Sequence, residues 1–254
     1  CGEATRALLD LPAATPGAPP WLAPHQVPAH DRLVAIVSKH GGAVLADAVG
    51  LGKSYVALAV ALTLDAEPAL VVPAVLIPQW RALMRRLAVR GSICSHERLS
   101  RDPDAWPDSA SAAASLVIVD EAHHFRNPQS RRYRTLARHV VGKRVLLVSA
   151  TPVHHRAAEL LHLLRLFLRD DALVAVGVSS LAREARNDEP APSTIGALTR
   201  FVVARSRHRI VTTWTGLAFP QRADPVTVAE LPAPADQIRD LAEGIGRAMH
   251  VEYQ

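Results

Sequence analysis

The sequence contains few cysteines and no long apolar run. Only two of its 254 residues are cysteine, too few for a disulfide framework or a four-thiolate zinc site, which favours a reducing, intracellular setting. The longest uncharged apolar run, residues 54–64, is about half as long as a bilayer span requires. No signal-peptide pattern opens the chain. We therefore expect a cytoplasmic protein with no membrane partner.

Lysine is also scarce, because the 29 basic residues comprise 26 arginines and three lysines. The net charge of +5 permits binding to a polyanion, but a GC-rich genome also produces chains rich in Arg and Ala. The charge alone leaves both explanations open, whereas a lysine inside a motif, such as Lys53, is informative. The chain starts at Cys1 rather than Met, so we expect a fragment of a longer protein.

Short apolar runs alternate with amphipathic stretches, which predicts an α/β fold with a central, mainly parallel sheet flanked by helices. The hydrophobic fraction of 49% is sufficient for a core. Loops are expected at 101–115 and 187–194. The predicted strands are 42–45, 69–72, 116–119, 145–148 and 201–204. The predicted helices are 30–39, 53–64, 75–90, 130–139, 154–169 and 235–249.

A phosphate-binding loop is predicted where Gly50-Leu51-Gly52-Lys53-Ser54 follows a strand and opens a helix. Glycines allow a tight turn around phosphates, and backbone amides at the helix start point toward them. Lys53 is expected to bridge the β- and γ-phosphates of ATP, and the Ser54 hydroxyl to bind Mg²⁺. However, Asp47 stands where the usual loop has its first glycine, and Gly-Lys-Ser alone is common by chance.

Two further motifs follow predicted strands: Asp120-Glu121-Ala122-His123 after 116–119, and Ser149-Ala150-Thr151 after 145–148. Ligands bind beyond the carboxyl ends of parallel strands, so the acidic pair is expected beside the phosphate loop. Asp120 would hold Mg²⁺ through water, and Glu121 would orient and deprotonate the attacking water. A solvated acidic strand end and a simple helix cap at Thr151 are the alternatives. The order of the three motifs disfavours both.

These motifs resemble those of superfamily 2 helicases and translocases, and among them the N-terminal RecA-like lobe of bacterial Swi/Snf-type ATPases. The run from Asp47 to Ser54 resembles the family's D-E-M-G-L-G-K-T, in which an aspartate occupies the same place. The family's L-R-P-[YH]-Q motif is similar to Leu22-Ala23-Pro24-His25-Gln26, which implies that the amide of Gln26 contacts the adenine base. The resemblance also implies that His123, with Ser149, Ala150 and Thr151, couples the nucleotide site to a second lobe.

The resemblance extends to elements that contact nucleic acid. Residues 71–80 are similar to L-V-V-P-x-x-L-x-x-Q-W, which implies contacts by Pro73 and Trp80, and His96 lies in the next, weaker element. Residues 198–207 resemble F-[VI]-x-R-R-[ST]-[KR], near the end of the first lobe. The implied organisation is a Pro-rich arm at 1–21, a RecA-like ATP-binding lobe at 22–231 and an exit helix at 232–254.

The sequence has no good match to the second lobe's Q-x-x-G-R-x-x-R segment. Residues 243–247 resemble it only in part, because the glutamine and the final arginine are missing. The predicted function is the ATP-binding lobe of a nucleic-acid-dependent ATPase that translocates on or remodels DNA. Its expected partner is DNA, with duplex favoured, or another nucleic acid, and its expected cofactors are ATP and Mg²⁺. The isolated chain is expected to be nearly inactive without the second lobe. The alternative is a nucleotide-gated interaction module acting on a protein–nucleic acid complex, such as RNA polymerase or a defence complex.

Three side-chain groups have simpler explanations. The histidines at 123, 124, 154, 155 and 162 invite a zinc site, but His123 already belongs to the acidic motif. The arginines at 126, 131, 132, 134 and 138 fit a solvated helical face or a phosphate-backbone contact. Trp80 has helical spacing from apolar neighbours, so a place in the core competes with a role in base stacking.

Overall fold

The computed structural model describes residues 17–101, 113–150, 157–187 and 192–213. The chain divides into two units, Cys1–Leu217 and Ala218–Gln254, and every described residue lies in the first. The predicted exit helix and most of the predicted arm lie outside the described residues. In the part of the chain that is described, none of the helices has the length and apolarity that a membrane span requires.

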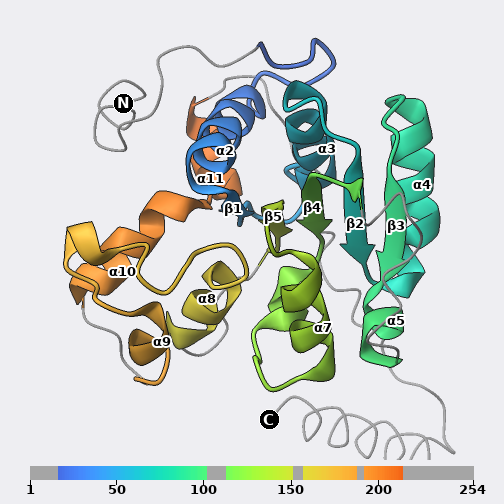
Figure 1. Cartoon of the computed structure of the whole chain (residues 1–254). Coiled ribbons are helices and arrows are strands. Elements are labelled where there is room, and N and C mark those ends of the chain that lie inside the picture. The colour runs from blue at the N-terminus through green and yellow to red at the C-terminus, as the bar shows by residue number, and fades with distance from the viewer. Residues whose placement is uncertain (1–16, 102–112, 151–156, 188–191, 214–254) are drawn as a thin grey trace, which may run out of the picture. The chain divides into compact units, whose positions relative to one another are not determined.

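Within the described residues, six strands form one sheet in the order β3-β2-β4-β5-β1-β6. Every pair of neighbouring strands is parallel. Figure 1 shows the strands from β1 to β3 side by side in this order. The strands are β1 (Gly42–Leu45), β2 (Pro68–Val72), β3 (Ser92–Ser95), β4 (Leu116–Val119), β5 (Arg144–Val148) and β6 (Val202–Val203).

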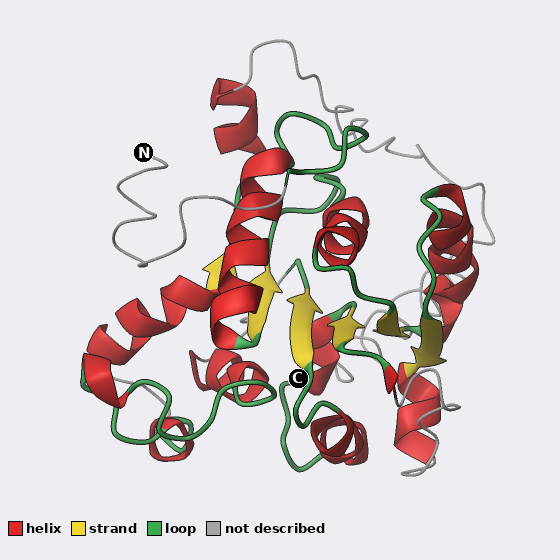
Figure 2. Cartoon of the chain, turned by 45° about the horizontal axis from the view of Figure 1, so that its top comes forward, coloured by secondary structure: helices red, strands yellow, loops and turns green. Residues whose placement is uncertain are grey.

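Helices enclose the strands, as the view coloured by secondary structure shows (Figure 2). In Figure 1, α2 and α3 lie on one side of the sheet, and α7 and α8 on the other. The α-helices are α2 (Val27–His40), α3 (Lys53–Thr63), α4 (Ile77–Arg86), α5 (His96–Arg101), α7 (Arg131–His139), α8 (Ala157–Leu164), α9 (Leu181–Glu184), α10 (Pro192–Leu198) and α11 (Arg207–Thr213). Short 3-10 helices occur at Ala74–Leu76, Ala122–Phe125, Val174–Val176 and Thr199–Phe201.

The core lies on both faces of the sheet. All residues of β1, β2 and β4 are buried, and so are four of the five residues of β5. A parallel strand covered on both faces needs an uninterrupted apolar sequence, which is what 116–119 and 145–148 provide. The predicted α/β class with a parallel sheet flanked by helices is confirmed.

The structure differs from the prediction at several elements. Edge strand β3 was not predicted, because Ser92–Ser95 is short and only Cys94 in it is buried. The helix predicted at 75–90 is divided into Ala74–Leu76 and α4, with a proline in the first turn of α4. The loop predicted at 187–194 is wrong at its end, where α10 begins at Pro192. The strand predicted at 201–204 narrows to β6, because 199–201 forms a 3-10 turn.

The strand order determines where the functional motifs meet. β5 lies between β1 and β4, so the carboxyl ends of these three strands are neighbours. The glycine-rich loop follows β1, the acidic motif follows β4, and Ser149 follows β5. The three motifs therefore leave the same edge of the sheet, which is where parallel α/β sheets bind ligands.

Candidate active site

The predicted phosphate loop connects β1 to α3. Gly50 and Gly52 have φ values of +88° and +75°, in the left-handed region that favours glycine. At Gly52 an added Cβ would also meet Nε2 of Gln26, so that side chain would have to move. Leu51 is buried and anchors the loop, while Ser54 is half-buried in the first turn of α3. The loop thus opens a helix, as an anion site requires.

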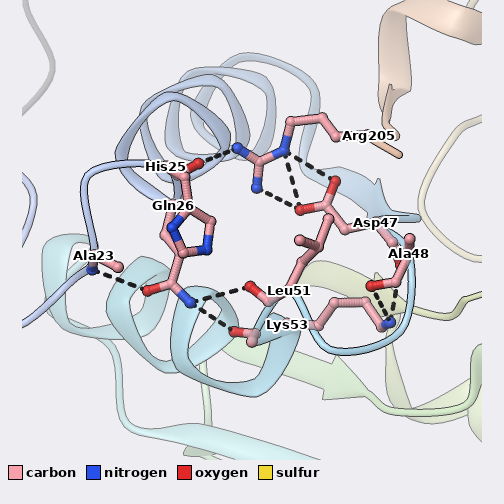
Figure 3. Close-up of polar contacts among 9 residues, drawn as sticks. Ala23, His25, Gln26, Asp47, Ala48, Leu51, Lys53 and Arg205 are labelled. Atoms are coloured by element: carbon pink, nitrogen blue, oxygen red, sulfur yellow. Dashed lines mark hydrogen bonds and ion pairs between the residues drawn. The ribbon is translucent and has the colours of Figure 1, made fainter. Parts of the chain in front are cut away.

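Gln26 fastens this loop to the turn that precedes α2. Its Nε2 donates to the carbonyl oxygen of Leu51 at 3.1 Å and to that of Gly52 at 3.5 Å. Its Oε1 accepts from the backbone amide of Ala23 at 3.1 Å. Both ends of the buried amide therefore bind backbone groups (Figure 3). The predicted contact to adenine remains a prediction, and it requires that this amide exchange at least one of its present partners.

Lys53 lies at the centre of the loop. Its Nζ donates to the carbonyl oxygens of Asp47, at 2.9 Å, and Ala48, at 3.4 Å (Figure 3). Burial lowers the pKa of this ammonium group, and the charges of Glu121, Asp47 and Asp120 partly oppose the effect. The ammonium is therefore electrostatically close to three carboxylates that come from two different strand ends.

Asp120 is buried directly after β4. Its Oδ2 accepts from the indole Nε1 of Trp80 at 2.9 Å, and its Oδ1 accepts from the backbone amide of Glu121 at 3.0 Å. Burial raises the pKa of Asp120, while the bond from Trp80 and the charge of Lys53 lower it. A carboxylate held in this way has a fixed orientation, and a nearby cation would offset the cost of its buried charge.

Glu121 lies in a left-handed backbone conformation, with φ +47° and ψ +48°, and its Oε2 is 3.2 Å from His123 Nδ1. The hydrogen bond to His123 lowers the pKa of Glu121, so this carboxylate is ionised at neutral pH. His123 Nδ1 also lies 3.2 Å from the hydroxyl of Ser149. The histidine therefore connects the acidic motif after β4 with the serine after β5.

The other residues predicted to couple the nucleotide site to a second lobe are Ser149, Ala150 and Thr151. Ser149 is fully buried, and its backbone amide donates to the carbonyl oxygen of Leu45 at 3.0 Å. Ala150 is half-buried beside it, and Thr151 lies outside the described residues. Of the predicted coupling set, the structure brings His123 and Ser149 into contact.

The residues predicted to contact nucleic acid are Pro73, Trp80 and His96. Pro73 is half-buried, immediately after β2. Trp80 is 1% exposed and His96 is 2% exposed, so neither side chain offers a surface to nucleic acid in this structure. The alternative place of Trp80 in the core is confirmed. Burial, followed by the charge of His124, lowers the pKa of His96 to about 4, so His96 is neutral at physiological pH.

Sequence reasoning missed the partner of Asp47. This carboxylate is fully buried, and both of its oxygens lie 3.1 Å from Nε of Arg205, which follows β6. Arg205 lies 158 positions further along the chain. The available signal was a charged residue just after a buried strand, because a buried carboxylate requires a cation or several donors. The sequence does not indicate which of the 26 arginines supplies it.

Among residues 17–101, 113–150, 157–187 and 192–213, no three His, Cys, Asp or Glu side chains are grouped so as to hold a metal ion.

Arginines 131, 134 and 138 are exposed on α7, and Arg126 lies 3.8 Å from Glu159. The exposure of the three arginines on α7 fits both a solvated helical face and a phosphate contact.

The sheet order, the glycine-rich loop before α3 and the acidic strand end together have the architecture of a phosphate-loop nucleotide-binding lobe. Comparison with known proteins agrees. Residues 92–178 match the family model of the SNF2-related domain. An uncharacterized ATP-dependent helicase, YqhH of Bacillus subtilis (strain 168), is 30% identical over 183 residues, which are 65% of this chain and 31% of that protein.

Two solved structures have a similar fold. The Sulfolobus solfataricus SWI2/SNF2 ATPase core in complex with dsDNA has a TM-score of 0.57 and 16% identity, over 78% of this chain and 47% of that chain. The S. solfataricus SWI2/SNF2 ATPase core domain has a TM-score of 0.56 and 15% identity, over 79% and 47%. The chain thus spans about a third of the bacterial helicase's length and about half of each solved chain's length.

Together, the family model, the bacterial relative and the fold support a Swi/Snf-type superfamily 2 helicase lobe. These similarities agree with the family predicted from the motifs. The matched residues, 92–178, include the acidic motif and Ser149 but not the phosphate loop, so the loop's assignment comes from the motif and its place in the fold.

Proposed function

We propose that the chain is the ATP-binding lobe of a nucleic-acid-dependent ATPase that translocates on or remodels DNA. The observation that carries this proposal is the convergence of Lys53 with Asp120 and Glu121 at the carboxyl ends of β1 and β4. Similarity to an ATP-dependent helicase and to a fold that has been solved with dsDNA supports it.

In this proposal the phosphate loop holds ATP. Backbone amides at the start of α3 would face the phosphates, and Lys53 would exchange its two carbonyl partners for phosphate oxygens. Those carbonyls hold the ammonium inside the loop, so the site is organised before nucleotide arrives. Gln26 would face the adenine from the turn before α2.

The oxygen donors of Ser54 and Asp120 are of the kind that Mg²⁺ prefers, and Asp120 is a buried carboxylate whose charge a cation would compensate. Mg²⁺ bound with ATP would neutralise charge on the phosphates. Glu121, kept ionised by His123, would orient a water molecule and accept its proton as the water attacks the γ-phosphorus. The bond from the γ-phosphorus to the bridging oxygen then breaks, and ADP leaves.

We further propose that a second RecA-like lobe completes the site. Arginine fingers accelerate related phosphoryl transfers by about 10³–10⁵-fold. On this basis the 254-residue chain binds nucleotide weakly and hydrolyses it slowly, whereas the full-length protein is stimulated by DNA. Closure of two lobes around ATP and their reopening after hydrolysis would then move the DNA contacts by a small step.

The experiment compares Lys53→Ala with Lys143→Ala, which removes a lysine just before β5, at the other end of the strands. We expect the first variant to lose ATP binding at least about 10-fold while the second binds as the unmodified chain does, measured by titration with a fluorescent nucleotide. Equal binding by both variants would contradict the assignment of the phosphate loop.

Dependence on nucleic acid is tested on the full-length protein by measuring ATP hydrolysis with duplex DNA, with single-stranded DNA and with neither. We expect the greatest rate with duplex DNA. Stimulation by neither polynucleotide would overturn this part of the proposal and would favour a nucleotide-gated interaction module instead. Fast hydrolysis by the 254-residue chain, lost in Lys53→Ala, would show that no second lobe is required.

A further inference from the structure

Residues 203–207 run beside the first half of the phosphate loop. The backbone amide of Ala46 donates to the carbonyl oxygen of Val203 at 2.7 Å, and that of Ala48 donates to the carbonyl oxygen of Arg205 at 2.9 Å. Nε of Arg207 then donates to the carbonyl oxygen of Val49 at 2.7 Å. The backbone pairing of β1 with β6 therefore continues past both strands as far as Ala48, and the Arg207 side chain extends the contact to Val49.

The central contact of this pairing is ionic. Asp47 is fully buried and the Arg205 side chain is 13% exposed, and Nε of Arg205 is 3.1 Å from each carboxylate oxygen. Nη2 of Arg205 also binds Oδ2 of Asp47. A planar guanidinium that meets a carboxylate with two nitrogens fixes both the distance and the orientation of the partner. Arg205 therefore determines the direction in which the chain leaves β1.

The third guanidinium nitrogen points to a different part of the site. Nη1 of Arg205 donates to the carbonyl oxygen of His25, the residue before Gln26 (Figure 3). Gln26 in turn binds the carbonyl oxygen of Leu51, on the far side of the loop. One side chain thus connects the beginning of the phosphate loop with the turn before α2, and Gln26 connects that turn with the end of the loop.

From this arrangement we propose that Arg205 is a positioning residue for nucleotide binding. This proposal rests on the proposed ATP site. It adds Arg205, a residue from near the C-terminal end of the lobe, which acts through Asp47 and His25 rather than by touching ATP. Without Arg205, Asp47 is a buried charge that has lost its ion-pair partner, the loop loses its fixed starting direction, and the turn that carries Gln26 loses one of its anchors.

The test measures the dissociation constant for a fluorescent ATP analogue with Mg²⁺ on the 254-residue chain. Arg205→Ala is expected to weaken binding at least about 10-fold at a temperature where thermal melting shows the variant folded. Arg205→Lys keeps the charge but cannot bind both carboxylate oxygens and the His25 carbonyl together. It is expected to recover part of the loss and to bind about 3-fold more weakly than the unmodified chain.

Two comparisons separate positioning from general destabilisation. Arg144→Ala removes an arginine that bonds Ser115 at 3.2 Å at the amino end of β5, and it is expected to leave nucleotide affinity unchanged. The double variant Asp47→Asn/Arg205→Ala is expected to bind no more weakly than Arg205→Ala, because both changes break the same contact.

The outcomes are distinct. Unchanged affinity in a folded Arg205→Ala, or in Arg205→Lys if the alanine variant does not fold, would overturn the positioning role while the ATP site stands. Losses that add in the double variant would show that Arg205 does not act through Asp47. If the unmodified chain binds no nucleotide, the proposed function fails and this role fails with it.

Discussion

Two buried aspartates at the same edge of the sheet, Asp47 and Asp120, have different partners. Asp47 follows β1 and forms an ion pair with Arg205, so its charge is compensated inside the chain. Asp120 follows β4 and accepts hydrogen bonds from two neutral donors, Trp80 Nε1 and the amide of Glu121. Burial raises the pKa of Asp120. The first carboxylate is already satisfied, whereas the second can still stabilise a cation.

The difference suggests how to distinguish structural from chemical carboxylates in such a site. Burial alone does not separate them, because both side chains are buried. A buried acid with a bidentate arginine contributes to the fold, and its removal leaves an uncompensated cation. A buried acid held by neutral donors keeps its negative charge at a cost, and that cost is repaid when a cation binds.

The largest expected effect is on stability, at the ion pair. Asp47→Asn leaves the guanidinium of Arg205 without its counter-charge, and breaking a buried pair in this way costs about 3–5 kcal/mol. The free energy of unfolding, measured by urea titration of the 254-residue chain, should fall by this amount. A loss of less than about 1 kcal/mol in the free energy of unfolding would show that the ion pair of Asp47 with Arg205 does not stabilise the fold as proposed.

The next effect is at Asp120, where we expect a large loss of activity and a small change in stability, the opposite of the effect at Asp47. Asp120→Asn removes a charge that burial disfavours and loses one accepted hydrogen bond, so the free energy of unfolding should change by about 1 kcal/mol or less. Hydrolysis of ATP by the full-length protein, and its apparent affinity for Mg²⁺, should fall about 10–100-fold, as for other residues that support a metal site. An Asp120→Asn variant with full activity would remove Asp120 from the proposed metal site.

The smallest effect concerns the donor that holds Asp120. Trp80→Phe removes the indole bond, which lowers the pKa of Asp120, so the pKa of this carboxyl should rise further. Because the proposed activity needs ionised Asp120, activity is lost as pH falls through that pKa. The acid limb of the rate profile should therefore move to higher pH, with about 1–2 kcal/mol of lost stability.

The matched control for this change is Trp21→Phe, since Trp21 is exposed and its ring pairs with that of Tyr55 rather than bonding Asp120. Its rate profile, measured on the full-length protein between pH 5 and pH 8, should coincide with that of the unmodified protein. A Trp80→Phe profile that also coincides would mean that the indole bond does not influence the titration of Asp120.

Much of the fold could be predicted because its signals are local. Residues 116–119 and 145–148 are continuous apolar runs, and both are buried strands in the structure. Helix α3 begins at Lys53, as the glycine-rich loop indicated. The differences had weak local signals: β3, which was not predicted, is an edge strand with a mixed sequence, and β6, which is shorter than predicted, has only two residues. Such strands form because a neighbouring strand offers hydrogen bonds, which the local sequence does not show.

The candidate site divides in the same way. Lys53, Ser54, Asp120, Glu121 and Ser149 could be named in advance because they belong to contiguous motifs at the ends of predicted strands. The burial of Trp80 against Asp120 could not, because the two residues are 40 positions apart and their contact depends on how α4 packs. The motif resemblance implied nucleic-acid contacts by Trp80 and His96, and the helical spacing of Trp80 offered the core as the alternative; both side chains are buried.

By itself, the sequence determined the class of the fold, the place of the glycine-rich loop and the identity of the acidic pair, since each follows from the order of residues along a short stretch. Only the tertiary structure decided which arginine neutralises Asp47. That choice depends on β6 pairing beside β1, which brings residues 158 positions apart into contact. A buried carboxylate in a sequence shows that a partner is needed, but the sheet order determines which partner it finds.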